Sequence, residues 1–125
     1  MTPTEMLELK RQSRSKWAAI VADLETKVPE LEPGFTCRDC GYCQAYGVTA
    51  ALKYVCRRCP LCDEALCFCG EGEAYTAVAD FYDLENEVAQ TEALDHARVM
   101  LAAIEADIVK DEAALKKVGV NHGQA

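Results

Sequence analysis

The sequence contains no hydrophobic run long enough to cross a membrane. Its longest apolar runs, Trp17 to Ala22 and Val99 to Ile104, are far shorter than the roughly 20 residues that a membrane span needs. The first residues, Met1 to Glu5, are polar and differ from a secretory signal. With 125 residues the chain amounts to one domain, and we expect a cytoplasmic protein that has no contact with membranes.

The sequence motifs of common enzymes are missing as well. The chain has no Walker loop, no Gly-x-Ser-x-Gly sequence and no deaminase signature. The carboxylates of Asp80, Asp83 and Glu87 follow helical spacing, which indicates a solvated helix face rather than a catalytic pair. The sequence therefore predicts a protein that is not an enzyme.

Positively charged residues are outnumbered by negatively charged ones, and the net charge differs between segments of the chain. The 13 Lys and Arg residues face 21 Asp and Glu residues, which gives a net charge of −8. Residues 71–125 account for all of this excess, whereas residues 35–70 carry a net charge of +1. Because nucleic-acid binding depends on Lys and Arg neutralising phosphates, this distribution disfavours a nucleic acid and favours a basic protein surface as the partner.

The first segment of the chain is predicted to be one amphipathic helix over residues 2–28. Thr2 suits the N-cap, Pro3 the first helical position, and Glu5 completes a capping box, while Pro29 ends the helix. Lys10, Arg11, Arg14 and Lys16 are predicted to lie on a solvated face. The predicted apolar stripe, interrupted by Ser13, consists of Met6, Leu9, Trp17, Ile20, Leu24 and Val28.

Residues 29–36 contain two prolines and a glycine and are predicted to be a linker. Residues 73–118 lack both residue types and are predicted to be helical, as one long helix or as a hairpin packed like a coiled coil, with a flexible tail at 119–125. A shift in the phase of the pattern between Gln90 and Ala93 indicates a kink, a stammer or a turn.

The main apolar seam of the C-terminal segment needs a partner helix. Asp111 interrupts this seam, which consists of Leu94, Ala97, Leu101, Ile104, Ile108, Leu115 and Val118. A second, out-of-phase seam consists of Phe81, Leu84, Val88 and Thr91. The partner is predicted to be either the N-terminal helix of the same chain or the same helix of a second copy, which would give a homodimer.

All eight cysteines lie between Cys37 and Cys69, in the predicted metal-binding module of residues 37–72. Disulfides are disfavoured in a reducing cytoplasm, so metal ligation is the expected use of these thiols. Eight thiolates make two sets of four, which suits two zinc ions. The best first site pairs two C-x2-C turns, Cys37/Cys40 and Cys59/Cys62, and leaves Cys43, Cys56, Cys67 and Cys69 for a second site.

The first pairing carries a resemblance to a known class of zinc protein. The sequences Cys37-Arg38-Asp39-Cys40-Gly41 and Cys59-Pro60-Leu61-Cys62, with 18 residues between Cys40 and Cys59, together resemble the knuckle pair of a zinc ribbon or treble clef. This resemblance implies a structural four-cysteine site and names no partner.

A different pairing, Cys37/Cys40 with Cys56/Cys59 between two helical segments, is similar to the DksA/TraR class of transcription regulators. That similarity implies a regulatory protein that acts on RNA polymerase. The four additional cysteines and the shorter loop depart from that class.

Iron–sulfur clusters are the alternative cofactor. Cys37/Cys40/Cys43 and Cys56/Cys59/Cys62 are each C-x2-C-x2-C runs, which could supply three corners of two 4Fe–4S clusters that Cys67 and Cys69 complete. The chain would then transfer electrons or sense redox state. Neither run is followed by the x3-Cys-Pro of bacterial ferredoxins, so zinc remains the preferred assignment.

Three further predictions concern the histidines, the tryptophan and the basic residues of the cysteine segment. His96 and His122 are expected at the surface rather than as ligands, and Trp17 is expected in the core. The basic residues of the cysteine segment either offset thiolate charge or contact a partner; they are Arg38, Lys53, Arg57 and Arg58. The sequence thus predicts a mainly α zinc protein that serves as a protein-interaction or regulatory module, with a nucleic-acid-binding zinc protein as another alternative.

Overall fold

A computed structural model of the chain describes residues 2–34, 42, 60, 73–83 and 88–123. These residues form the helices α1 (Pro3–Leu24), α4 (Glu73–Asp83) and α5 (Gln90–Gly123), and no strand occurs among them. The mainly helical fold class is therefore confirmed for the described residues. Apart from Tyr42 and Pro60, the predicted metal-binding module of residues 37–72 lies outside them.

The start of α1 matches the sequence prediction. The Thr2 side chain accepts a hydrogen bond from the Glu5 amide at 3.1 Å, and the Glu5 carboxylate accepts one from the Thr2 amide at 3.4 Å. Pro3 occupies the first turn, where its missing N–H costs nothing. The predicted capping box is therefore confirmed.

The end of α1 does not match the prediction. The helix ends at Leu24 instead of residue 28, and Val28 is 71% exposed rather than part of the apolar stripe. The chain turns early because the Asp23 carboxylate accepts hydrogen bonds from the backbone amides of Glu30 and Leu31. The side chain of Thr26 also donates to the Asp23 carbonyl, at 2.6 Å. Residues 29–34 contain neither helix nor strand, as the linker prediction requires.

The buried stripe of α1 is shifted from the predicted one. Met6 and Leu9 are only half-buried, and Ser13, which looked like an interruption, is itself buried. The spacing of the buried residues is that of a helix lying along one neighbour. The buried stripe consists of Leu7, Lys10, Ser13, Trp17, Ile20 and Leu24.

The C-terminal segment is a pair of helices rather than one. α4 ends at Asp83 and α5 begins at Gln90. Of the three explanations for the phase shift predicted between Gln90 and Ala93, the turn between two helices is therefore the one present, and it ends where the predicted shift begins. The predicted helix end at residue 118 is too early, because α5 continues through Gly119 to Gly123 and takes up most of the expected tail.

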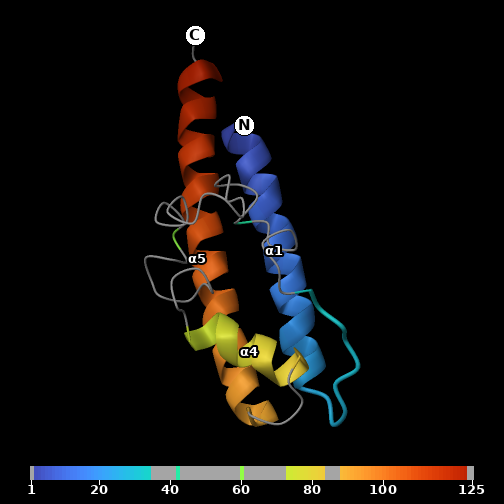
Figure 1. The fold of residues 1–125 in the computed structure, drawn as a ribbon. Helices are drawn as coiled ribbons and strands as arrows, with labels where there is room; N and C mark the ends of the chain where they lie inside the picture. Colours follow the sequence, from blue (N-terminus) through green and yellow to red (C-terminus); the bar gives the residue numbers. More distant parts are fainter. Residues whose placement is uncertain (1, 35–41, 43–59, 61–72, 84–87, 124–125) are drawn as a thin grey trace, which may run out of the picture.

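α1 and α5 lie side by side and run antiparallel, and α4 packs across the lower part of α5 (Figure 1). Residue pairs along the two long helices fix their register. Arg11 meets Glu112 near the N-terminus of α1, and Gln90 reaches the carbonyl of Leu24 at its other end. The apolar seam of α5 therefore finds its partner within the chain, as one of the two predicted arrangements has it.

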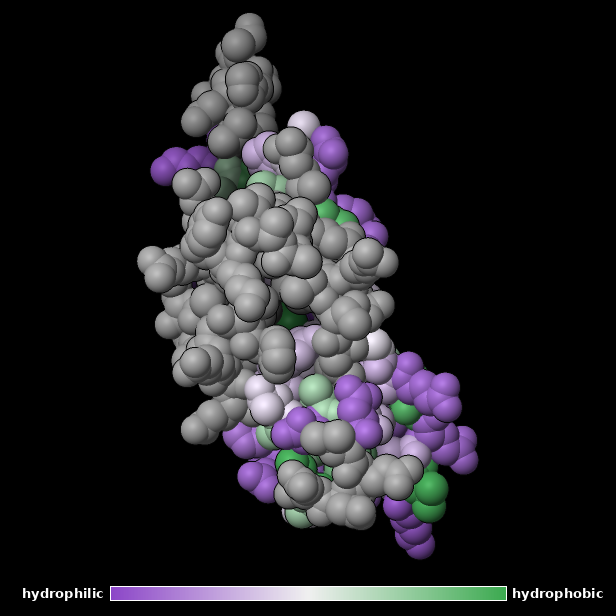
Figure 2. Space-filling view, in the orientation of Figure 1, coloured by the Kyte–Doolittle hydropathy of each residue, from purple (hydrophilic) through white to green (hydrophobic). Residues whose placement is uncertain are grey.

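The core fills the space where the three helices meet. Ile20, Val78, Ile104 and Ile108 are completely buried. Trp17 is 2% exposed, and its ring centroid lies 6.0 Å from that of Tyr75 on α4, so its predicted core role is confirmed. Outside the grey atoms, the visible surface is mostly hydrophilic, with hydrophobic residues in small separate patches (Figure 2). None of the helices among the described residues has both the length and the apolar character that a membrane span needs.

This packing predicts opposite outcomes for two apolar residues that the sequence pattern placed on one stripe. Ile20→Ala should lower the free energy of unfolding by about 2–5 kcal/mol, because it opens a cavity in the core. Val28→Ala should change it by less than about 0.5 kcal/mol, because Val28 is exposed. Urea unfolding followed by circular dichroism measures both. Equal losses in the two variants would contradict the observed end of α1.

Candidate functional site

The cysteines predicted to bind metal all lie outside the described residues, and so do the basic residues predicted to accompany them. The first set is Cys37, Cys40, Cys59, Cys62, Cys43, Cys56, Cys67 and Cys69. The second set is Arg38, Lys53, Arg57 and Arg58. Two residues of this segment are described: Tyr42, which is buried, and Pro60, which is half-buried.

Tyr42 is the best-defined point of the cysteine segment. In sequence it lies between Cys40 and Cys43, and its side chain is completely buried. The hydroxyl donates a hydrogen bond of 2.8 Å to Oδ2 of Asp107 on α5, and the ring centroid lies 5.4 Å from Nζ of Lys10 on α1. Tyr42 thus contacts α5 through its hydroxyl group and α1 through its aromatic ring.

Lys10 is the centre of a buried charge cluster between α1 and α5. Its side chain is 2% exposed, and Nζ lies 2.8 Å from Oδ2 of Asp107 and 2.6 Å from Oδ2 of Asp111. The two aspartates are one helical turn apart, so both carboxylates reach the same ammonium group. The carboxylates are 14% and 34% exposed, which means that water screens the Lys10–Asp111 pair more than the Lys10–Asp107 pair.

Hydrogen bonding satisfies this cluster internally. Oδ2 of Asp107 accepts from both the Lys10 ammonium and the Tyr42 hydroxyl. Among the described residues, no buried side-chain nitrogen or oxygen lacks a hydrogen-bond partner. Removing Lys10 would leave two neighbouring carboxylates without a positive charge between them, which is costly where water reaches them poorly. The cluster is therefore suited to fixing the position of Tyr42 against the helix pair.

The prediction that Lys10 lies on a solvated basic face is wrong. Arg11, Arg14 and Lys16 keep part of their side chains in solvent, but Lys10 belongs to the buried stripe. The sequence did contain a signal for this arrangement. Ser13 interrupts the apolar pattern of α1 and Asp111 that of α5, and two polar interruptions on facing helices indicate a polar contact between them.

A second polar network holds the segment after α1 against α4 and α5. The Tyr82 hydroxyl donates to Oδ2 of Asp23 at 2.6 Å. The Gln90 amide group donates to the carbonyls of Leu24 at 3.0 Å and Thr26 at 2.6 Å. These bonds connect the end of α1 to α4 and to the first residue of α5, so the three helices are joined at this end.

The Asp23 network shifts two pKa values in opposite directions. Burial tends to raise the pKa of Asp23, but hydrogen bonds from Tyr82 and from the amides of Glu30 and Leu31 outweigh it and lower this pKa below its ordinary value. Burial, together with the hydrogen bond to the Asp23 carboxylate and its negative charge, raises the pKa of Tyr82 well above its ordinary value. Asp23 is therefore held ionised and Tyr82 protonated at neutral pH.

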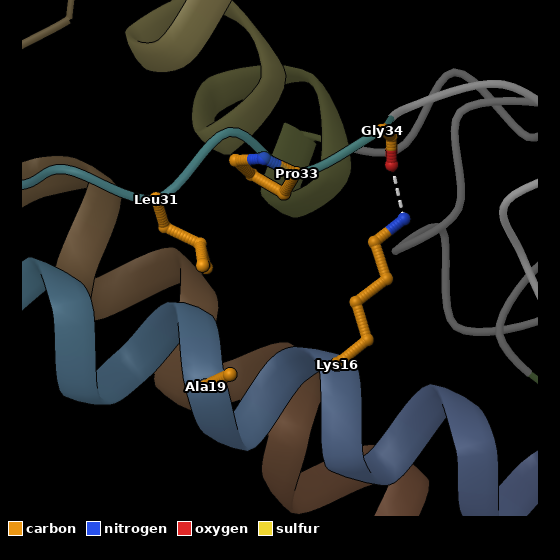
Figure 3. A pocket seen from close by; sticks show the side chains of 5 residues that line it. All are labelled: Lys16, Ala19, Leu31, Pro33 and Gly34. Atoms are coloured by element: carbon orange, nitrogen blue, oxygen red, sulfur yellow. Dashed lines mark hydrogen bonds between the residues drawn. The ribbon is translucent and has the colours of Figure 1, made fainter.

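A hollow of about 280 Å³ lies between α1 and residues 31–34. Figure 3 shows Lys16 reaching across it to donate a hydrogen bond to the Gly34 carbonyl, with Leu31, Pro33 and Ala19 as the other lining residues. Its lining contains one amine and no carboxylate, so it has no acid–base pair. The Lys16 bond instead holds the last described residue before the cysteine segment against α1.

Of the two histidines in the sequence, His96 has a described side chain, whereas His122 is described only as part of a helix. His96 lies half-buried on α5, and His122 belongs to the last turn of that helix. No group of three or more His, Cys, Asp or Glu residues with metal-binding geometry occurs among the described residues.

Comparison with known proteins identifies no relative, since no family model matches the chain and no curated protein or solved structure matches it significantly.

The burial of Lys10 predicts strong coupling to Asp107. In a double-mutant cycle with Lys10→Met and Asp107→Asn, we expect a coupling energy of about 1.5–3 kcal/mol. Lys10→Met removes the cation beside the Asp107 carboxylate, and Asp107→Asn removes the less exposed of the two carboxylates beside Lys10. Arg11 and Glu112 provide the matched control, since they join the same two helices at 3.1 Å but are 38% and 45% exposed. Their coupling should stay below about 0.5 kcal/mol. Equal couplings in the two cycles would contradict the buried character of the cluster.

The Asp23–Tyr82 pair predicts a pH-dependent effect of Tyr82→Phe. Near pH 7 this change should lower the free energy of unfolding by about 1 kcal/mol, since it removes a hydrogen bond to a carboxylate. The lowered pKa of Asp23 stabilises the fold above the ordinary value of 3.8 and ceases to do so as the pH falls through the folded-state value. The raised pKa of Tyr82 stabilises it below the ordinary value of 10.0, and this contribution is lost as the pH rises further.

The difference between wild type and Tyr82→Phe should therefore be largest between about pH 5 and pH 9 and shrink on both sides. Urea unfolding at a series of pH values measures it. A difference that stays constant from pH 3 to pH 11 would show that the lost hydrogen bond is not coupled to either ionisation.

Proposed function

We propose that this chain is a small zinc protein whose eight cysteines form two structural sites of four thiolates each. Cys37, Cys40, Cys59 and Cys62 form the first site. Cys43, Cys56, Cys67 and Cys69 form the second. The metal-organised segment and the helices together act as a protein-interaction or regulatory module, and the similarity to the DksA/TraR class suggests a transcription-related assembly.

The burial of Tyr42 is the observation that carries this proposal. It lies between two cysteines of the first C-x2-C-x2-C run, and it contacts the Lys10–Asp107 pair of the helix scaffold. Metal ligation would stabilise the cysteine segment, because metal binding and folding are coupled in such modules. Tyr42 gives this segment a fixed attachment to α1 and α5.

The chemistry of the donor set supports zinc in a structural role. Thiolates are soft ligands that suit tetrahedral zinc, and sites of four thiolates leave no position open for a water molecule. Bound zinc would cross-link turns of the chain and supply no reaction chemistry. The chain's own residues would then do the rest: Tyr42 and Lys10 attach the module, and the Lys16–Gly34 hydrogen bond holds its N-terminal approach against α1.

Charge supports a basic protein as the partner. Each zinc ion with four thiolates carries a formal charge of −2, so two sites would change the total from −8 to −8 − 4 = −12. Exposed acidic residues of α5, including Glu92 and Asp95, add to this negative surface. Complementary charge accelerates association with a basic surface and repels nucleic acid.

Metal analysis of protein purified without air tests the proposal. We expect a colourless protein that contains about two zinc ions and no acid-labile sulfide per chain. Brown protein that contains iron and sulfide would replace zinc by the iron–sulfur alternative. A metal-free protein with unchanged unfolding behaviour would contradict both assignments.

Cys37→Ser provides the matching test of the first site. It should lower the zinc content by about one ion and destabilise the protein, because a ligand is lost. Ala45→Ser places the same side chain at a non-cysteine position of the same segment and should leave the zinc content unchanged. Full zinc content in Cys37→Ser would contradict the assignment of this cysteine as a ligand.

A further inference from the structure

α5 has an exposed apolar face that the packing of the described helices leaves uncovered. Val99 is 51% exposed and Val109 is 63% exposed, although both lie in the middle part of the helix. Ala102, Ala106 and Ala113 are also exposed. These five residues are called the outer face of α5 below.

The outer face lies opposite the residues that α5 uses inside the chain. Its buried residues are Ala93, Ala97, Met100, Ile104 and Ile108, which pack in the core with α1 and α4. On a heptad wheel with Val99 at position a, the five buried residues occupy positions b, c and f, on the side of the helix opposite to a and d. The predicted homodimer seam, which includes Leu94 and Leu101, lies toward the chain's own core, so a second copy would have to use the outer face.

The spacing of the outer face is that of a coiled-coil seam. From Val99 to Ala113 the steps are 3, 4, 3 and 4 residues, which places every member at an a or d position. Scattered exposed apolar residues are common on protein surfaces. The regular row spans two heptads, between Asp95 and Lys116 at the neighbouring d positions, and places valine at one a and one d position. Because the row is short, the charges beside it have to supply part of the specificity for a partner helix.

The charged residues beside this seam determine which partner fits. Glu105 and Glu112 occupy g positions, and Lys110 and Lys117 occupy e positions. In a parallel pair of identical helices, each g residue faces the e residue five positions later on the other helix. Glu105 would then face the partner's Lys110, and Glu112 the partner's Lys117, and the two-fold symmetry would make each pair twice.

An antiparallel pair of the same helices lacks this complementarity. Position g then faces g and position e faces e, so Lys110 and Lys117 would face lysines of the other copy. Glu112 already pairs with Arg11 of its own chain, whereas Glu105 and Lys110 form no ion pair with any other described residue. These last two side chains are thus available for a contact between copies.

We propose that a second copy of this chain docks on the outer face of α5 and forms a parallel two-stranded coiled coil. The valines and alanines pack along the seam, and the Glu105–Lys110 pairs between copies set the parallel orientation. The contact leaves the α1–α5 packing intact, because α1 occupies the opposite side of α5. It requires no particular metal in the cysteine segment and is therefore independent of the function proposed above.

Charge reversal with sedimentation equilibrium of the full-length protein, purified with its metal, tests the proposal. Glu105→Lys or Lys110→Glu alone should each weaken self-association by about tenfold, because two attractive pairs become repulsive. A mixture of the two variants should associate as strongly as the wild type, because opposite charges face each other again. Glu32→Lys makes the same change of charge on an exposed residue outside α5 and should have no effect.

Two further variants change the seam itself. Val109→Asp should abolish association, whereas Val109→Leu should strengthen it, because leucine at a d position favours two-stranded coiled coils. Circular dichroism should show unchanged helix content in both variants, since the side chain at this position is exposed in the single chain. A wild-type protein that stays monomeric at millimolar concentration would overturn the proposal. Dimerisation that neither single charge reversal weakens would overturn the parallel arrangement.

Discussion

The buried ion pair between Lys10 and Asp107 is the constraint on which the arrangement of the helices depends. An ammonium group with 2% exposure is tolerated only where carboxylates compensate its charge, and α5 supplies two of them one turn apart. α1 and α5 can meet this requirement only in an arrangement that brings Lys10 within reach of Asp107 and Asp111. Tyr42 completes the cluster, so the same constraint also positions one residue of the cysteine segment.

Much of the fold can be predicted from the sequence, because the signals for it act between residues that are close together in the chain. The capping box of Thr2 and Glu5, the core position of Trp17 and the helical nature of the C-terminal segment are of this kind. The end of α1 depends instead on Asp23 binding amides seven and eight residues away, which helix periodicity does not reveal. The prediction of a solvated Lys10 is wrong for a similar reason, since the burial of Lys10 depends on aspartates about 100 residues later in the chain.

The candidate site also has one part that the sequence predicts and one part that it does not. The spacing of the eight cysteines predicts metal ligation from the sequence alone, because C-x2-C turns bring pairs of thiolates together. The attachment of that segment to the helices could not be predicted, since nothing in the pattern around Tyr42 distinguishes it from other tyrosines. The structure adds the attachment point of that segment, through the hydrogen bond from Tyr42 to Asp107.

The central claim is that a thiolate-bound metal organises a segment that Tyr42 attaches to an antiparallel helix pair. X-ray absorption at the zinc edge, on protein purified without air, tests the metal part of that claim most directly, because it reports the type, number and distance of the ligands. We predict four sulfur ligands per zinc ion at about 2.3 Å and no nitrogen or oxygen ligand. A first shell that contains oxygen or imidazole nitrogen, or an absence of zinc from the protein, would contradict the account.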